Sequence, residues 1–240
     1  MTASERAHVL LARVLALHDE WALVARGLDE TALHAPSALP GWARAHLLSH
    51  VARNADGLGN LLAWAKTGVE TPMYATATER DEGIEAGADR SLAEIADDVV
   101  ASGERFTDLA ASLKDEAWTG EARDRQGRPI TGEGVLRKRL AEASIHLADL
   151  DLGYDFARVA GLLGNEFEVV VSSAIGSYGE GLPSVLVVAA DSDGTRHEWR
   201  MGTGDPVTVT GTPGDVLAWI TGRSDGSTLD GQAPSLPHWL

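Results

Sequence analysis

The sequence contains no cysteine. This absence excludes disulfide bonds, zinc sites built on cysteine and a cysteine nucleophile. Any reaction of this protein that needs a thiolate must therefore take its sulfur from a bound small molecule. The lack of cysteine does not by itself fix the cellular compartment.

Positive charge is also scarce, with 20 Lys and Arg against 36 Asp and Glu and a formal net charge of −16. Nucleic-acid binding depends on clustered Lys and Arg that contact phosphates, and the sequence shows no such cluster. We therefore expect no nucleic-acid partner. An anionic ligand would be repelled at long range, so a few well-placed arginines would have to override the global field locally.

Long apolar runs are missing as well, and no stretch predicts a membrane span. The N-terminal segment MTASERAHVLLARVLALHDEW carries charges inside its apolar run, so it indicates an amphipathic helix and not a signal peptide. We expect a cytoplasmic protein without a membrane partner. A chain of 240 residues has room for one large or two modest domains, each with its own core.

Apolar spacing predicts four long helices in the first part of the chain. Ser91 and Glu94 have the spacing of a capping box, and Thr131 is a candidate N-cap for the last of the four. The intervening segments LHAPSALPGW, VETPMYATA and ARDRQGRPITG read as loops or turn-rich excursions. Helices of this length joined by loops predict an antiparallel bundle. The predicted helices cover residues 4–26, 43–66, 91–113 and 132–152.

The composition changes after Tyr154, where a small α+β domain is predicted. Residues 161–180 have a helical pattern, and the turn DSDG between SVLVVAAD and RHEWRM is a hairpin signal. PVTVTG is a further strand candidate, and TPGDVLAWITGR a short helix. We therefore predict two domains, residues 1–154 and 155–240.

Three candidate metal ligands lie on the second and fourth predicted helices: His50, Glu142 and His146. Glu142 and His146 are four residues apart in EASIH, so they share one helix face. Bundles build metal sites from inward-facing residues of neighbouring helices. Two imidazoles and one carboxylate suit zinc and leave a fourth position open, as a catalytic metal requires. The same spacing also occurs by chance, and a helix histidine is more often a core or surface group.

Neighbouring polar residues leave some assignments open. His46 is a rival ligand, because it lies four residues before His50. We prefer His50, since Asn54 extends its polar stripe by another turn, which makes Asn54 a candidate for cofactor binding. Asp149 is either an acceptor for an imidazole N–H of His146 or a solvated acid at the helix end.

Two longer motifs are more specific than this spacing. The run LPGWARAHLLSHVARNADGLGNLLAWAKTGVETPMY and the later RLAEASIHLADLDLG resemble the mycothiol-dependent maleylpyruvate isomerases, and the likeness extends to the terminal GRSDG…PHWL. The resemblance implies an N-terminal four-helix bundle of the DinB type and a C-terminal α+β domain like the sterol carrier proteins. It also implies a divalent metal, zinc by preference, on His50, Glu142 and His146.

The resemblance further implies a cofactor and a reaction. The cofactor would be mycothiol, a low-molecular-weight thiol of actinobacteria, and the reaction the isomerisation of maleylpyruvate to fumarylpyruvate in gentisate catabolism. Reversible addition of the thiolate would turn the double bond of the substrate into a single bond that rotates. The substrate is a dicarboxylate, so we expect cationic partners, with Arg80 and Arg223 as candidates. Arg139, one turn before Glu142, is instead a candidate for supporting the metal ligands.

Two alternatives stay open at this point. A thiol S-transferase that acts on another electrophile would have the same bundle and the same metal ligands. A non-catalytic binding module would keep the core with a structural metal or none. The sequence does not indicate the oligomeric state.

Overall fold

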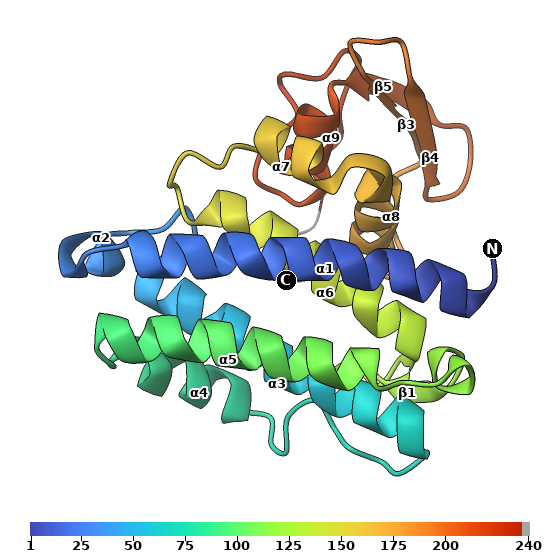
Figure 1. The fold of residues 1–240 in the computed structure, drawn as a ribbon. Coiled ribbons are helices and arrows are strands. Elements are labelled where there is room, and N and C mark those ends of the chain that lie inside the picture. Colours follow the sequence, from blue (N-terminus) through green and yellow to red (C-terminus); the bar gives the residue numbers. More distant parts are fainter. Residues whose placement is uncertain (237–240) are drawn as a thin grey trace. The chain divides into compact units, whose positions relative to one another are not determined.

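The computed structural model describes residues 1–236, so the final PHWL of the motif quoted above lies outside the described residues. The chain divides into two compact units (Figure 1), Met1–Asp151 and a second that begins at Leu152. Each unit is built around its own buried apolar side chains.

Four long helices form the first unit, and each lies within a few residues of its predicted range. Helix α1 packs against α5 and α6, and α3 packs against the same two helices, so the four enclose one apolar core. Trp21 and Phe106 are among its fully buried side chains. The helices are α1 (Ala3–Gly27), α3 (Arg44–Thr67), α5 (Leu92–Ala111) and α6 (Gly132–Asp149).

The ends of these helices follow the predicted signals. Ser91 and Glu94 form the capping box of α5, each side chain bonding to the backbone of the other residue. The hydroxyl of Thr131 accepts the backbone N–H of Gly134 at 3.1 Å and caps α6. Gly68 ends α3 with φ +70°, a left-handed conformation that glycine adopts without a steric penalty.

The segments between the long helices are more ordered than predicted. ARDRQGRPITG, expected as a turn-rich excursion, forms an antiparallel hairpin. Asp124 closes its turn, because its carboxylate accepts the backbone N–H groups of Gln126 and Arg128. Such local side-chain bonds stabilise a turn. The additional elements are α2 (Glu30–His34), α4 (Glu79–Ala88), the 3₁₀ helix η1 (Asp115–Trp118), β1 (Glu121–Arg123) and β2 (Pro129–Thr131).

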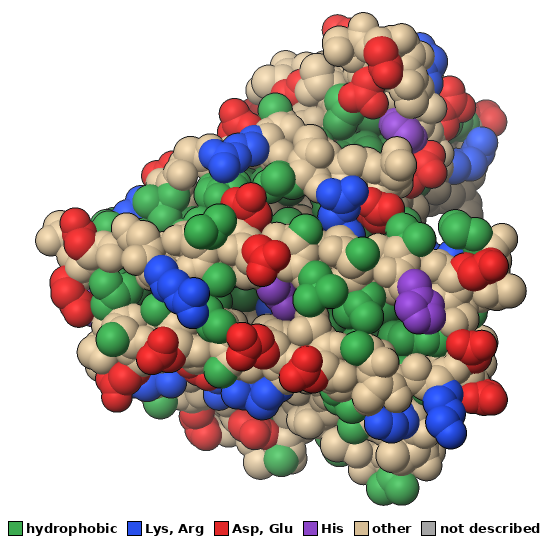
Figure 2. All heavy atoms as spheres, viewed as in Figure 1, with side chains coloured by type: hydrophobic (Ala, Val, Ile, Leu, Met, Phe, Trp, Pro, Cys, Tyr) green, Lys and Arg blue, Asp and Glu red, His purple; other side chains and the backbone are tan. Residues whose placement is uncertain are grey.

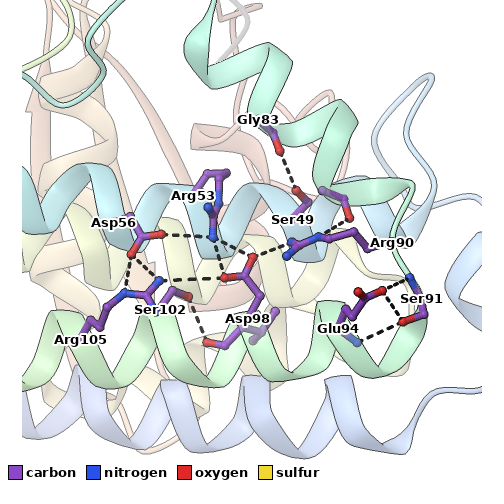
Figure 3. Close-up of polar contacts among 12 residues, drawn as sticks. Ser49, Arg53, Asp56, Gly83, Arg90, Ser91, Glu94, Asp98, Ser102 and Arg105 are labelled. Carbon is purple, nitrogen blue, oxygen red and sulfur yellow. Dashed lines mark hydrogen bonds and ion pairs between the residues drawn. The ribbon is translucent and has the colours of Figure 1, made fainter.

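A network of ion pairs joins α3 to α5 (Figure 3). The Asp98 carboxylate on α5 accepts hydrogen bonds from the guanidinium groups of Arg53 on α3, at 2.7 Å, and of Arg90, at 2.6 Å. Arg105 of α5 reaches back to Asp56 of α3 at 2.7 Å. Because Asp98 is mostly buried and accepts two guanidinium groups, this network is stronger than isolated surface pairs.

Helix α4 lies unusually close to α3. The Ser49 hydroxyl donates to the Gly83 carbonyl at 3.3 Å, as Figure 3 shows. A Cβ atom at Gly87 would lie 1.9 Å from the Ser49 hydroxyl oxygen. The two glycines, four residues apart, therefore give α4 a smooth face on which α3 packs.

The second unit contains a three-stranded sheet in the order β4–β3–β5. The predicted hairpin is present, with Val185 opposite Met201 in the antiparallel pair of β3 and β4. Strand β5 pairs with β3 in parallel, through a connection too long for a hairpin. The elements are α7 (Phe156–Leu163), the 3₁₀ helix η2 (Gly164–Glu166), α8 (Phe167–Ser177), β3 (Val185–Ala190), β4 (Arg196–Met201), β5 (Val207–Gly211) and α9 (Pro213–Ile220).

One helical stretch corrects an expectation from the sequence. Phe156–Ser177 is long and apolar enough by composition to cross a membrane, whereas no such stretch was predicted. Its apolar character has an explanation inside the unit, because α7 and α8 both pack against α9 and α8 also contacts β4. Core helices of soluble proteins pass the same test, so this one stretch is weak evidence for a membrane span.

Charges on the visible surface are mixed. On the face drawn in Figure 2, Lys and Arg side chains are dispersed among acidic ones and form no single basic patch. This agrees with the net charge of −16.

Candidate functional site

His50, Glu142 and His146 meet between two neighbouring helices. His50 comes from α3, and the other two come from successive turns of α6. The Nε2 atom of His50 lies 3.3 Å from the Glu142 Oε2 atom and 3.1 Å from the His146 Nε2 atom, and the third separation is 3.4 Å. The three side chains are buried, with exposed fractions of 4–6%.

This spacing fits a tetrahedral metal. Zinc–ligand bonds of 2.0–2.1 Å at tetrahedral angles place ligand atoms about 3.3–3.4 Å apart. Two imidazole nitrogens that face each other beside a carboxylate oxygen also present converging lone pairs, and a cation satisfies these better than hydrogen bonds do. The three residues can therefore hold a metal ion and leave one coordination position for a ligand.

Burial and mutual contacts set the charge of the three groups. Burial lowers the pKa of His50 to about 4. Burial alone would raise the pKa of Glu142, but hydrogen bonds with His146 and His50 hold it well below its usual range. Burial also opposes charge on His146, whose pKa is nevertheless raised by its bonds to Asp149 and Glu142. Glu142 is thus ionised and His50 neutral at pH 7, the forms in which both bind metals.

Asp149 is the acceptor for His146 and not a solvated acid. Its carboxylate lies 2.8 Å from the His146 Nδ1 atom, and the residue is 1% exposed. A carboxylate that accepts the Nδ1–H fixes the tautomer and points the Nε2 lone pair toward His50 and Glu142. Of the two interpretations of Asp149, the structure selects the acceptor.

Arg139 lies behind the cluster and ties three helices together. It is 1% exposed and donates to the Val51 carbonyl at 3.0 Å, to Asn54 Oδ1 at 2.9 Å and to His18 Nε2 at 3.0 Å. Burial lowers its pKa to about 10, so it is still a cation at pH 7. Asn54 is buried one turn after His50 with its amide oxygen held by Arg139, and its role in cofactor binding stays a prediction.

His18 was not identified from the sequence. Its ring is held inside the unit, and burial, followed by the Arg139 charge, lowers its pKa well below the ordinary value. The sequence feature that could have identified His18 is its position between the apolar residues Leu17 and Trp21 on α1. Its chemistry is that of a neutral acceptor for Arg139.

Arg80, the predicted substrate arginine in the first unit, is near the cluster. Its guanidinium lies 5.9 Å from the centre of the Trp42 ring, and that ring lies 5.6 Å from the ring of His50. The Arg80 charge also contributes, after larger causes, to the lowered pKa of His50. Arg80 pairs with exposed Asp81 at 2.6 Å, a neighbour that an anionic ligand can displace.

His46 does not join the cluster. Its Nδ1 atom accepts the Ala43 backbone N–H at 3.3 Å, and its Nε2 atom lies 3.5 Å from Glu85 of α4. These contacts place its ring nitrogens at the start of α3, away from Glu142. The structure therefore brings His50, and not its rival, together with the pair on α6.

Arg223 belongs to the second unit, just after α9. Its guanidinium donates to the Thr221 carbonyl at 2.6 Å, and its charge lowers the pKa of Tyr178 against the larger opposing effect of burial. Its proposed contact with substrate stays a prediction.

Comparison with known proteins places this geometry in context. The sequence model of the family "Mycothiol maleylpyruvate isomerase N-terminal domain" matches residues 14–151. Two solved structures are similar over 100% of this chain and 100% of their own. One is described as the mycothiol-dependent maleylpyruvate isomerase, with 24% identity and a TM-score of 0.81. The other is a variant of that enzyme with one histidine replaced by alanine, with 26% identity and a TM-score of 0.80. No curated protein matches the chain.

Proposed function

Because the chain belongs to the mycothiol maleylpyruvate isomerase family, we propose that it isomerises maleylpyruvate to fumarylpyruvate with a divalent metal and mycothiol. The observation that carries the proposal is the convergence of the His50, Glu142 and His146 donor atoms, 3.1–3.4 Å apart, in a chain without cysteine. The open coordination position of the metal would bind the external thiol, which supplies the sulfur that the chain lacks.

The three ligands would hold zinc, whose ligand preferences they match. Bound zinc supplies a Lewis acid that favours the thiolate form of a thiol. Mycothiol, when bound, would supply the sulfur for reversible addition to the double bond of the substrate, which could then rotate. The chain itself contributes a buried site, an ionised Glu142 and a His146 oriented by Asp149.

Cationic side chains would bind the two carboxylates of the substrate. Arg80 is our candidate in the first unit because its guanidinium lies over Trp42, which packs against His50. Arg223 is our candidate in the second unit. Both would attract the dianion against the net charge of −16, since charge-assisted hydrogen bonds act at short range where the global field does not.

The wider architecture completes the proposal. We assign residues 1–154 to a DinB-type four-helix bundle and residues 155–240 to a domain like the sterol carrier proteins. The pairwise packing of α1, α3, α5 and α6 supports the first assignment, and the sheet flanked by helices supports the second. Gentisate catabolism in the cytoplasm of an actinobacterium is the setting that fits the reaction.

An ultraviolet assay on maleylpyruvate, with and without mycothiol, tests the function. We expect isomerisation only with the thiol and with no net thiol consumption. Loss of the thiol into a stable adduct would instead indicate an S-transferase. Absence of both reactions in the zinc-loaded protein would contradict the proposal and leave a binding module.

A further inference from the structure

Tyr74 lies in the loop between α3 and α4 and packs against the helix that carries His50. Its ring fits where Gly57 has no side chain, because a Cβ atom there would lie 3.3 Å from the Tyr74 Cε1 atom and 2.9 Å from Met73. Gly57 follows His50 by seven residues, or two helical turns, so both are on one face of α3. The loop thus brings the phenol to the face of α3 from which His50 reaches the metal ligands of α6.

The hydroxyl of Tyr74 is buried, and no hydrogen-bond partner is present for it within residues 1–236. Buried hydroxyl groups are nearly always paired, since leaving one unpaired costs stability. A group of this kind is explained when a ligand supplies its partner. The buried, unpaired hydroxyl therefore indicates that Tyr74 faces a ligand.

The charges around Tyr74 are those of the candidate site. Burial raises the pKa of Tyr74 to about 12, and the next contribution comes from the Glu142 carboxylate, opposed by Arg80, Arg125 and Arg139. The phenol is therefore protonated at neutral pH and acts as a hydrogen-bond donor. The pKa of Tyr74 is thus influenced by the candidate metal ligand Glu142 and by the candidate substrate residue Arg80.

The same residue lines a cavity of the first unit. A cavity of about 380 Å³ is formed by the loop that contains Tyr74 and by the β1–β2 turn. Arg123 of β1 and Arg125 of the turn line it together with the acidic Glu70 and Asp124, so the wall offers both signs of charge. Tyr74 is thus part of the wall of this cavity, and its pKa is also raised by the Glu142 carboxylate.

We propose that Tyr74 is a catalytic residue whose hydroxyl donates a hydrogen bond to an anionic oxygen of the ligand bound beside His50, Glu142 and His146. The proposal rests on the proposed function. Addition of a cofactor thiolate to one alkene carbon would move the π electron pair onto the conjugated keto oxygen. The Tyr74 O–H would stabilise that oxygen without giving up its proton. After rotation the electron pair would re-form the alkene as the carbon–sulfur bond breaks and the thiolate leaves.

Tyr74→Phe is the direct test, because it keeps the ring beside Gly57 and removes only the hydroxyl. We expect kcat to fall about 10- to 100-fold, the effect of losing one hydrogen bond to a charged atom, with KM and zinc content nearly unchanged. Tyr154→Phe is the matched control. Its ring contacts the Arg158 guanidinium at 4.0 Å in the second unit, and this contact survives the change.

A binding measurement separates this proposal from the proposed function. Calorimetric titration of the zinc-loaded protein with oxalate, an unreactive dianion, should show about 10- to 100-fold weaker binding in Tyr74→Phe than in Tyr154→Phe. Gly57→Ala, which displaces the phenol, should weaken oxalate binding in the same direction. If the wild-type protein does not isomerise maleylpyruvate, the proposed function is wrong. The oxalate titration then still tests whether the Tyr74 hydroxyl binds an anionic ligand. Wild-type oxalate affinity in Tyr74→Phe would overturn the role of the hydroxyl.

Discussion

The His146 Nδ1 atom lies 2.8 Å from a carboxylate oxygen of Asp149, and Asp149 is 1% exposed. The contact joins a proposed metal ligand to an acid one turn further along α6. It orients the imidazole and raises its basicity, so Asp149 would act on a bound metal through His146.

Asp149→Asn should weaken zinc binding by about 10- to 100-fold, because an amide neither carries the charge nor fixes the tautomer of His146 as a carboxylate does. Competition with a chromogenic chelator measures this change. Asp151→Asn is the matched control, since Asp151 is an exposed acid beyond the end of α6 with φ +55°, a conformation that asparagine tolerates. Equal zinc affinity in both variants would remove Asp149 from the metal site.

His50→Ala and His146→Ala should each lose the single zinc-class ion that we expect per chain, since two remaining ligands hold zinc poorly. The helical circular dichroism should persist because the apolar core is not altered. His46→Ala should keep the metal, as its nitrogens contact Ala43 and Glu85 instead. Atomic emission analysis of the purified variants gives the metal content, and loss of zinc in His46→Ala alone would show that the ligand on α3 is misassigned.

The long helices and the shared face of two candidate metal ligands were predictable because their signals are local. A capping box at Ser91 and a glycine at position 68 mark helix ends within a few residues, and Glu142 and His146 share a face by spacing alone. The choice of His50 over His46 as candidate ligand depends on the packing of α3 on α6, which brings His50 and not His46 to Glu142 and His146.

Other features depend on contacts between distant segments. Helix α4 has a weak apolar pattern and is held by the close approach of Gly83 and Gly87 to α3, which no local signal encodes. Strand β5 pairs in parallel with β3, although β4 lies between them in the sequence. His18 acquires its role only because Arg139, 121 residues later, donates to it.

Arg80→Ala should lower kcat/KM by about 10- to 100-fold at unchanged zinc content, the loss expected for one charge-assisted bond to a substrate carboxylate. Arg223→Ala should have the same effect if it binds the second carboxylate. Arg105→Ala, whose exposed side chain pairs with Asp56, is the control for loss of one positive charge. Steady-state kinetics on maleylpyruvate decide, and wild-type constants in either predicted variant would exclude that arginine from substrate binding.

The stability of the metal-free protein should fall as the pH drops below about 6.5, the ordinary pKa of histidine. The pKa of His18 is lowered in the folded state by burial and by Arg139, so below pH 6.5 the unfolded chain binds a proton that the folded chain does not. The free energy of unfolding then rises with pH up to this value and is independent of His18 above it. Urea unfolding from pH 5 to 8 measures the slope.

His18→Gln keeps an acceptor for Arg139 and removes the titration, so its slope below pH 6.5 should be smaller by up to about 1.4 kcal/mol per pH unit. His8→Gln on the same helix is the matched control, because His8 is exposed, with its Nδ1 atom 2.7 Å from the Ser4 carbonyl and its ring edge-on to Trp118. Identical slopes in the wild type and His18→Gln would show that His18 is protonated equally in both states.

Activity should require a low-molecular-weight thiol, because the chain has no cysteine with which to form the carbon–sulfur bond. Mycothiol should support isomerisation in catalytic amounts, since elimination returns the thiol after each turnover. Dithiothreitol should support it poorly, because contacts with the sugar parts of mycothiol help to position its sulfur. Following maleylpyruvate by ultraviolet absorbance while titrating free thiol measures both quantities. Full activity without any thiol would refute reversible addition, and stoichiometric thiol loss would favour the S-transferase.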